Sequence, residues 1–178
     1  PARGHLRGPS TPPDRRQPWM SQQMTTGRDP ITPLEALELL KEGNRRFLDD
    51  APYNPPMDRL HRLHLAAAQQ PFAAYLSCSD SRVPPELLFE RGLGELFIVR
   101  NAGNTLCATA LGSLEFAVTQ LQVPLIVVMG HEACGAIRAA VSVAREQAAY
   151  TGNVSKVLQS LLPAVLEADP WAEDLCNA

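Results

Sequence analysis

The chain has 178 residues, of which 45% are hydrophobic and 20% are charged, and its formal net charge is −3. This composition is typical of a globular domain with one core, and it gives no reason to expect binding to nucleic acid or to an anionic membrane. The longest uninterrupted apolar run, at 124–129, is too short to cross a bilayer. The sequence shows no secretory signal, so we expect a cytoplasmic protein whose four cysteines are reduced.

The first thirty residues differ in composition from the rest of the chain. They hold six of the sixteen prolines, and Arg, Ser, Thr and Gln lie between these prolines with almost no apolar periodicity. Such a segment cannot bury enough apolar surface to offset the entropy that it loses on ordering. We therefore expect a flexible N-terminal arm over residues 1–30 and one folded domain over residues 31–178.

The folded part begins with two predicted helices. Thr32, Pro33 and Glu35 form a capping-box signature, with proline at the first helical position. An apolar stripe continues this helix to about Leu48. A second helix is predicted over 58–70, between segments that contain prolines.

Short apolar strands then alternate with helices. The predicted elements, in chain order, are a strand at 72–77, a strand at 95–100, a helix at 108–120, a strand at 125–130, a helix at 136–150 and a helix at 156–168. Gly152 and Asn153 are predicted to form a turn, and Pro163 to kink the last helix. Because strands that alternate with helices form parallel sheets, the sequence predicts an α/β fold with a parallel sheet flanked by helices.

Two cysteines and a histidine directly follow two of these strands. Cys78 follows the first strand, and His131 and Cys134 follow the third. The carboxyl ends of parallel strands share one edge of a sheet, so the three side chains meet there if the two strands are neighbours. Two thiolates and an imidazole suit zinc, and three protein ligands leave a fourth position open, as in catalytic zinc sites. We therefore predict that these residues bind Zn²⁺.

Two further residues of the first loop have side chains that suit such a site. Asp80 is placed to accept a hydrogen bond from a hydroxide on the metal, and Arg82 is placed to hold Asp80 by a bidentate contact. Two other interpretations stay open. The cysteines can be core residues or a disulfide, with His131 a polar residue at a strand end. Alternatively, Cys107 can complete a structural site with four ligands.

Four segments of the chain resemble the successive signatures of β-class carbonic anhydrases. These segments, which follow the order of the family, are GNRRF at 43–47, CSDSRVPPE at 78–86, RNAGN at 100–104 and GHEACGA at 130–136. The resemblance extends from about Thr32 to the end of the chain. It implies zinc-dependent, reversible hydration of carbon dioxide to bicarbonate and a proton by a metal-bound hydroxide.

The resemblance also assigns roles to particular residues and implies an assembly. The positions that match functional positions of the family are the metal ligands Cys78, His131 and Cys134, the catalytic pair Asp80 and Arg82, and the substrate-pocket residues Phe97 and Ala102. The family has a parallel sheet in the order 2-1-3-4, and its members form homodimers or larger homo-oligomers. The same features are therefore expected for this chain.

The chain departs from the family at its C-terminal end. Members of the family continue with a helix and a further edge strand, so we expect a truncated sheet that lacks this strand and leaves an edge uncovered. Two alternative functions follow. One is a carbon disulfide or carbonyl sulfide hydrolase that uses the same metal site, and the other is a non-catalytic zinc-binding or truncated homologue. His61 and His64 are interpreted as a solvated helix face rather than a proton shuttle.

Overall fold

The structure is a computed structural model that describes residues 31–51 and 53–168. The arm expected over residues 1–30 and the chain end at 169–178 therefore lie outside the described residues. Within the described part of the chain, no helix is both long and apolar enough to span a membrane.

Helix α1 (Pro33–Leu48) begins with the predicted capping box. The hydroxyl of Thr32 accepts a hydrogen bond from the amide of Glu35 at 3.2 Å, and the Glu35 carboxylate accepts one from the amide of Thr32 at 2.7 Å. These bonds satisfy two amides that the start of a helix leaves without helical partners. They also hold the pKa of the Glu35 carboxyl below its ordinary value.

Helix α2 (Arg59–Ala67) is shorter than predicted and buries none of its residues. Its start agrees with the prediction, because the Asp58 side chain accepts a hydrogen bond from the amide of His61 at 2.8 Å. The prediction of a helix to residue 70 was wrong. Ala68 is extended, with φ −161° and ψ 155°, and the chain leaves the helix there on its way to the first strand.

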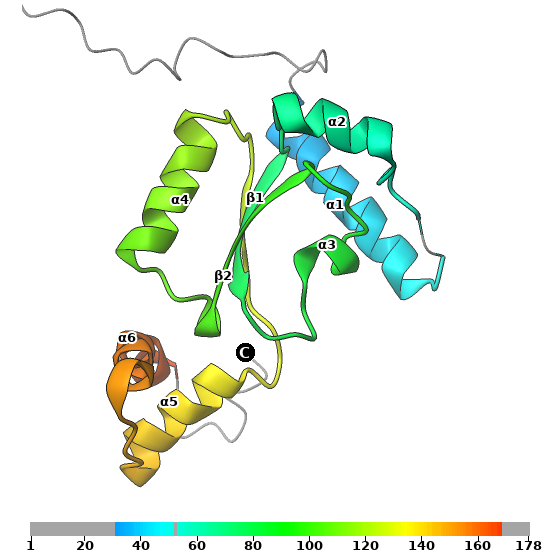
Figure 1. Ribbon diagram of the computed structural model, residues 1–178. Coiled ribbons are helices and arrows are strands. Elements are labelled where there is room, and N and C mark those ends of the chain that lie inside the picture. Colours follow the sequence, from blue (N-terminus) through cyan, green and yellow to red (C-terminus); the bar gives the residue numbers. More distant parts are fainter. Residues whose placement is uncertain (1–30, 52, 169–178) are drawn as a thin grey trace, which may run out of the picture.

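The core is a three-stranded parallel sheet in the order β2-β1-β3. Figure 1 shows β1 and β2 side by side. Strand β1 (Ala73–Cys78) lies in the middle, between β2 (Leu96–Asn101) and β3 (Ile126–Met129). Because β1 has a neighbour on each side and a packed layer on each face, all of its residues are buried. This arrangement confirms the predicted α/β fold, with the order 2-1-3-4 in truncated form.

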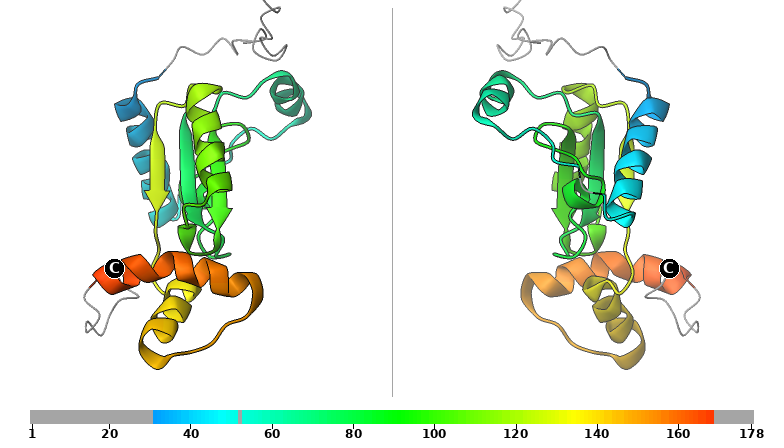
Figure 2. Two further views of the ribbon diagram at one scale, coloured as in Figure 1. Left: turned by 90° about the vertical axis from the view of Figure 1, so that its left-hand side faces the viewer. Right: turned by 90° about the vertical axis from the view of Figure 1, so that its right-hand side faces the viewer.

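Helices cover both faces of the sheet (Figure 2). Successive residues of a strand point to opposite faces, and β1 follows this rule. Ala73 and Tyr75 join the apolar cluster under α1. Ala74 and Leu76 join the cluster under α4 (Ala108–Thr119). The central strand is thus fixed from both sides, and its last residue, Cys78, is held in a defined place.

Helices α5 (Gly135–Glu146) and α6 (Gly152–Glu167) pack against each other beyond the carboxyl ends of the strands (Figure 2). Their common core contains Ala140 of α5 and, from α6, Leu158, Leu161 and Val165. This helix pair therefore lies at the same edge of the sheet as the predicted metal ligands.

Two boundaries in this pair differ from the prediction. Helix α5 ends at Glu146 rather than near residue 150, because Gln147 adopts the left-handed conformation with φ 54°. Helix α6 begins at Gly152, inside the predicted turn, and Gly152 has a positive φ of 67° that glycine tolerates. Pro163 lies inside α6, and its kink stays a prediction.

Two short elements were not predicted, namely α3 (Pro85–Leu88) and the 3-10 helix η2 (Ala102–Asn104). In η2, Gly103 has a φ of 68°. A Cβ at this position would lie 2.9 Å from Cδ1 of Leu161 and 3.1 Å from Cβ of Ala136. Glycine therefore lets the segment after β2 pass close to both α5 and α6.

Candidate metal centre

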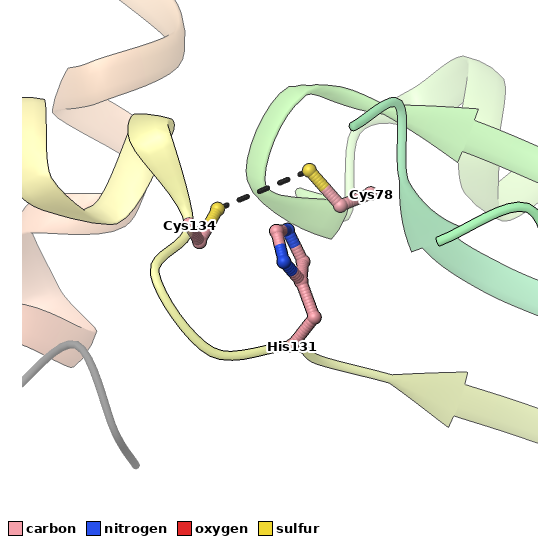
Figure 3. A group of neighbouring side chains, drawn as sticks. All are labelled: Cys78, His131 and Cys134. Carbon is pink, nitrogen blue, oxygen red and sulfur yellow. Dashed lines mark hydrogen bonds between the residues drawn. The ribbon is translucent and has the colours of Figure 1, made fainter. Parts of the chain in front are cut away.

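Cys78, His131 and Cys134 lie together at the carboxyl edge of the sheet (Figure 3). One nitrogen or sulfur atom from each side chain lies within 4.8 Å of those of the other two. The sheet register explains this meeting, since Ser77 of β1 pairs with Met129 of β3 and the two loops begin side by side. The structure thus brings together the three side chains that the sequence singled out.

The distances and burial of the donor atoms fit a zinc ion. The two sulfur atoms of Cys78 and Cys134 are 3.9 Å apart. Two thiolates on one tetrahedral zinc ion, each about 2.3 Å from it, lie about 3.8 Å from each other. Nε2 of His131 is buried and has no hydrogen-bond partner among the described residues. Because a buried polar atom without a partner is costly, this nitrogen suits a metal ligand.

Cys78 and Cys134 are both buried, but within the described residues they form no disulfide, and Cys107 does not join them. Cys78, Cys107 and Cys134 are all free thiols. Cys107 is exposed at the start of α4, and it does not belong to the cluster of three. Within residues 31–51 and 53–168, the cluster has no fourth histidine, cysteine or carboxylate ligand. A site with three protein ligands is therefore the arrangement that these residues present.

The two thiols differ in their electrostatic surroundings. Burial raises the pKa of Cys78, but hydrogen bonds from the amides of Asp80 and Gly103 and from the side chains of His131 and Cys134 outweigh it, and the pKa is lowered. The Gly103 amide donates to the Cys78 sulfur at 3.4 Å.

For Cys134, burial dominates and raises the pKa, although amides at the start of α5 oppose it. The negative charge of Cys78 adds to this increase. Cys78 is therefore the thiol that ionises first. A divalent cation at this place would favour the ionised form of both sulfurs.

Arg82 holds the carboxylate of Asp80 beside the cluster. Its Nε donates to Oδ1 at 2.9 Å, its Nη2 donates to Oδ2 at 2.7 Å, and its amide donates to Oδ1 at 3.0 Å. These contacts hold the pKa of Asp80 well below its usual range. Oδ2 of Asp80 lies 4.0 Å from Nε2 of His131. An ionised hydrogen-bond acceptor is therefore kept at the side of the three candidate ligands.

The two residues predicted to line a substrate pocket, Phe97 and Ala102, lie at different distances from the cluster. Phe97 is in β2, and Ala102 is in the segment that follows it. Ala102 is the first residue of η2 and directly precedes Gly103, which contacts Cys78. Phe97 pairs with Ala74, four residues before Cys78, and this corresponds to about 13 Å along a strand. Its ring stacks on Phe116 at a centroid distance of 6.3 Å. Ala102 thus lies near the cluster, whereas Phe97 lies farther along the sheet.

His61 and His64 lie away from this cluster. Both line a cavity of about 350 Å³ between α2 and the loop at 92–95, and none of the three candidate ligands lines it. Nε2 of His61 is 3.4 Å from the carbonyl oxygen of Leu93. These contacts offer no support for a proton shuttle.

Arg100 belongs to the RNAGN segment, but no role was predicted for it from the sequence. Its Nε donates to the carbonyl oxygen of Cys78 at 2.8 Å, and its Nη2 donates to that of Asp80 at 2.5 Å. The only sequence signal for this residue was its place at the end of a predicted strand, in a segment that resembles a family signature. The contacts from Arg100 to the loop after β1 depend on the register between β1 and β2.

Comparisons with known proteins agree on one family. A family model described as carbonic anhydrase matches residues 73–176. Carbonic anhydrase 2 of Mycobacterium tuberculosis is 46% identical over 134 residues, which are 75% of this chain and 65% of that protein. This chain thus spans somewhat less than two thirds of that relative's length.

Solved structures give the same result. A β-carbonic anhydrase of Coccomyxa, in complex with acetazolamide, matches with a TM-score of 0.57 and 30% identity, over 75% of this chain and 59% of that one. A β-carbonic anhydrase of Aspergillus fumigatus matches with a TM-score of 0.55 and 26% identity, over 75% and 60%. Since the family model covers more than half of the chain and the fold agrees, this protein belongs to the β-class carbonic anhydrase family.

Proposed function

We propose that this protein binds Zn²⁺ and catalyses the reversible hydration of carbon dioxide to bicarbonate and a proton. The observation that carries this proposal is the cluster of Cys78, His131 and Cys134 in a chain of this family, with an ionised carboxylate beside it. A bound zinc ion would make a nucleophile derived from water available near neutral pH.

The three clustered side chains would hold the metal by the two sulfur atoms and by Nε2 of His131. The distance between the sulfurs and the lack of a partner for Nε2 support this ligand set. The amide of Gly103 donates to the Cys78 sulfur and would withdraw some of its negative charge. This effect matters because two thiolates neutralise much of the charge of a divalent ion.

Asp80 would accept a hydrogen bond from the attacking water. This bond would orient a lone pair of the water oxygen towards carbon dioxide. A carboxylate accepts hydrogen bonds at both oxygens only while it is ionised. The two side-chain bonds and the amide bond from Arg82 keep it ionised. Arg82 would therefore act by holding Asp80.

Carbon dioxide is apolar, so its pocket needs apolar side chains. We assign this lining to Ala102 and Phe97. The position of Ala102 next to Gly103 supports the first assignment. The second assignment requires a pocket that extends along β2 or is completed by another subunit.

We also propose that residues 31–178 belong to one carbonic anhydrase domain and that this domain forms a homodimer or a larger homo-oligomer. In the described residues, β3 pairs with β1 alone, and Val128 on β3 is 64% exposed. Leu34 and Leu48 of α1 are 74% and 70% exposed. Apolar surface of this kind is usually covered by further protein.

A direct test measures carbon dioxide hydration by stopped-flow with a pH indicator, on purified protein loaded with zinc. We expect hydration of carbon dioxide that depends on zinc, and we expect His131→Ala to abolish it. Cys107→Ser is the matched control, since Cys107 is an exposed thiol outside the cluster, and it should keep full activity. A protein that holds one zinc ion per chain but does not hydrate carbon dioxide would disprove the proposal. Release of sulfide from carbonyl sulfide would then identify the alternative hydrolase.

A further inference from the structure

Arg100 reaches from one strand to the loop that follows its neighbour. It lies near the end of β2, where the register pairs it with Ser77 of β1. One guanidinium donates to two carbonyl oxygens, those of Cys78 and Asp80, at 2.8 and 2.5 Å. The planar fork of arginine suits such a double contact, whereas the single ammonium of lysine does not.

The turn that receives these bonds carries two residues of the candidate site. Cys78 supplies a sulfur to the cluster, and the Asp80 side chain is bound by Arg82. Asp80 is therefore held at both ends, by Arg82 at the carboxylate and by Arg100 at the backbone carbonyl. The amide of Val83 also donates to this carbonyl, at 3.2 Å, and a carbonyl oxygen can accept two such bonds.

We propose that Arg100 is a positioning residue that fixes the backbone from Cys78 to Asp80, so that the sulfur and the carboxylate keep one geometry relative to each other. This inference rests on the proposed function, because it assigns Arg100 to the same site. Arg100 touches neither the sulfur nor the carboxylate through these bonds, and it acts through the backbone alone.

The sheet itself does not depend on this side chain. Strands β1 and β2 pair along their whole length, from Ala73 with Leu96 to Cys78 with Asn101. The amide of Ser79 donates to the carbonyl oxygen of Asn101 at 2.9 Å, and this bond does not involve Arg100. Removal of the guanidinium should therefore loosen the turn and leave the strand pairing intact.

The test compares Arg100→Gln with Arg62→Gln in the full chain. Arg62 is the matched control, because its Nη1 also donates to a backbone carbonyl, that of Met57, on the exposed helix α2. Zinc affinity is measured by competition with a chromophoric chelator, and the visible absorption spectrum is recorded on samples loaded with cobalt. Turnover and KM for carbon dioxide are measured in parallel.

Arg100→Gln should weaken zinc binding by about tenfold or more, as loss of a residue behind a metal ligand commonly does. It should change the cobalt spectrum and lower kcat by a similar factor while KM changes little. Arg62→Gln should match the wild type in every measurement. Arg100→Lys, which can keep one of the two bonds, should lie between the wild type and Arg100→Gln, and it serves as the test if Arg100→Gln does not fold.

The inference would be overturned if the Arg100 variants keep the zinc affinity and the cobalt spectrum of the wild type, even if their turnover falls. An equal loss in Arg62→Gln would overturn it too. The proposed function fails separately, if the wild type binds zinc but does not hydrate carbon dioxide. In that case the affinities and spectra still decide the role of Arg100.

Discussion

The Nη2 atom of Arg82 donates a hydrogen bond to the carbonyl oxygen of Ala133 at 3.2 Å. Ala133 lies between His131 and Cys134 in the loop after β3, and its φ of 53° is uncommon for a residue other than glycine. The same Nη2 atom donates to Asp80 in the loop after β1. One arginine thus connects the two loops that supply the candidate ligands.

This connection predicts that Arg82→Lys is not a conservative change. Lysine can place only one ammonium group where Arg82 uses two nitrogens on Asp80 and one of them also on Ala133. We expect kcat for carbon dioxide hydration to fall by about 10- to 100-fold. Asp80→Asn, which removes the ionised acceptor, should lower it by about 100-fold or more.

Stopped-flow assays at equal zinc content check both changes. Glu38→Gln is a suitable control, because it breaks the exposed pair between Glu38 and Lys41 on α1 and should leave turnover unchanged. Wild-type turnover in Arg82→Lys would contradict the role given to this contact.

Two glycines in helices should respond in opposite ways to alanine. A Cβ at Gly43 of α1 would lie 1.9 Å from the carbonyl oxygen of Phe89, whereas a Cβ at Gly112 of α4 would meet nothing within 4 Å. Gly43→Ala should therefore lower the free energy of unfolding by about 1 to 3 kcal/mol through overpacking. Gly112→Ala should raise it by up to about 1 kcal/mol, because alanine favours the helix. Urea unfolding of both variants checks this, and a gain in stability in Gly43→Ala would refute the close packing of α1 against the Phe89 carbonyl.

Tyr75 should make stability depend on alkaline pH. It is fully buried in β1, and its hydroxyl has no hydrogen-bond partner in the described part of the chain. Burial raises the pKa of this hydroxyl, although the charge of Arg91 opposes the increase. The unfolded chain releases the proton near pH 10, at about the ordinary tyrosine value. The stability that this group contributes is therefore complete below about pH 10 and is lost as the pH rises above it.

Tyr75→Phe removes both the unpaired hydroxyl and its titration. At neutral pH the variant should be at least as stable as the wild type, by up to about 1 kcal/mol, and its alkaline loss of stability should be smaller. Urea unfolding between pH 7 and pH 11 measures both effects, with Tyr150→Phe as an exposed control. A marked loss of stability at neutral pH would show that the hydroxyl has a partner.

The parts of the fold that sequence alone predicted are those with strong local signals. The capping box at Thr32 predicted the start of α1, and the three short apolar runs predicted the three strands. The cluster of candidate ligands could be expected because parallel strands end at one edge, and it needed only the adjacency of β1 and β3.

The features that escaped prediction depend on contacts between distant segments. Helix α5 stops at Glu146 because Gln147 turns left-handed, and no glycine or proline marks this end. Arg100 contacts the carbonyl oxygen of Cys78 because the register pairs Arg100 with Ser77. Periodicity along one strand does not reveal this register. The close approach of η2 to α6 likewise depends on Leu161, far along the chain from Gly103.

X-ray absorption at the zinc K edge, on protein loaded with one zinc ion per chain, measures whether Cys78, His131 and Cys134 hold the metal. We expect two sulfur ligands at about 2.3 Å and two nitrogen or oxygen ligands at about 2.0 to 2.1 Å. Cys78→Ser should reduce the sulfur count to one, whereas Cys107→Ser should leave it at two. Four sulfur ligands, or none, in the unchanged protein would contradict the proposed centre.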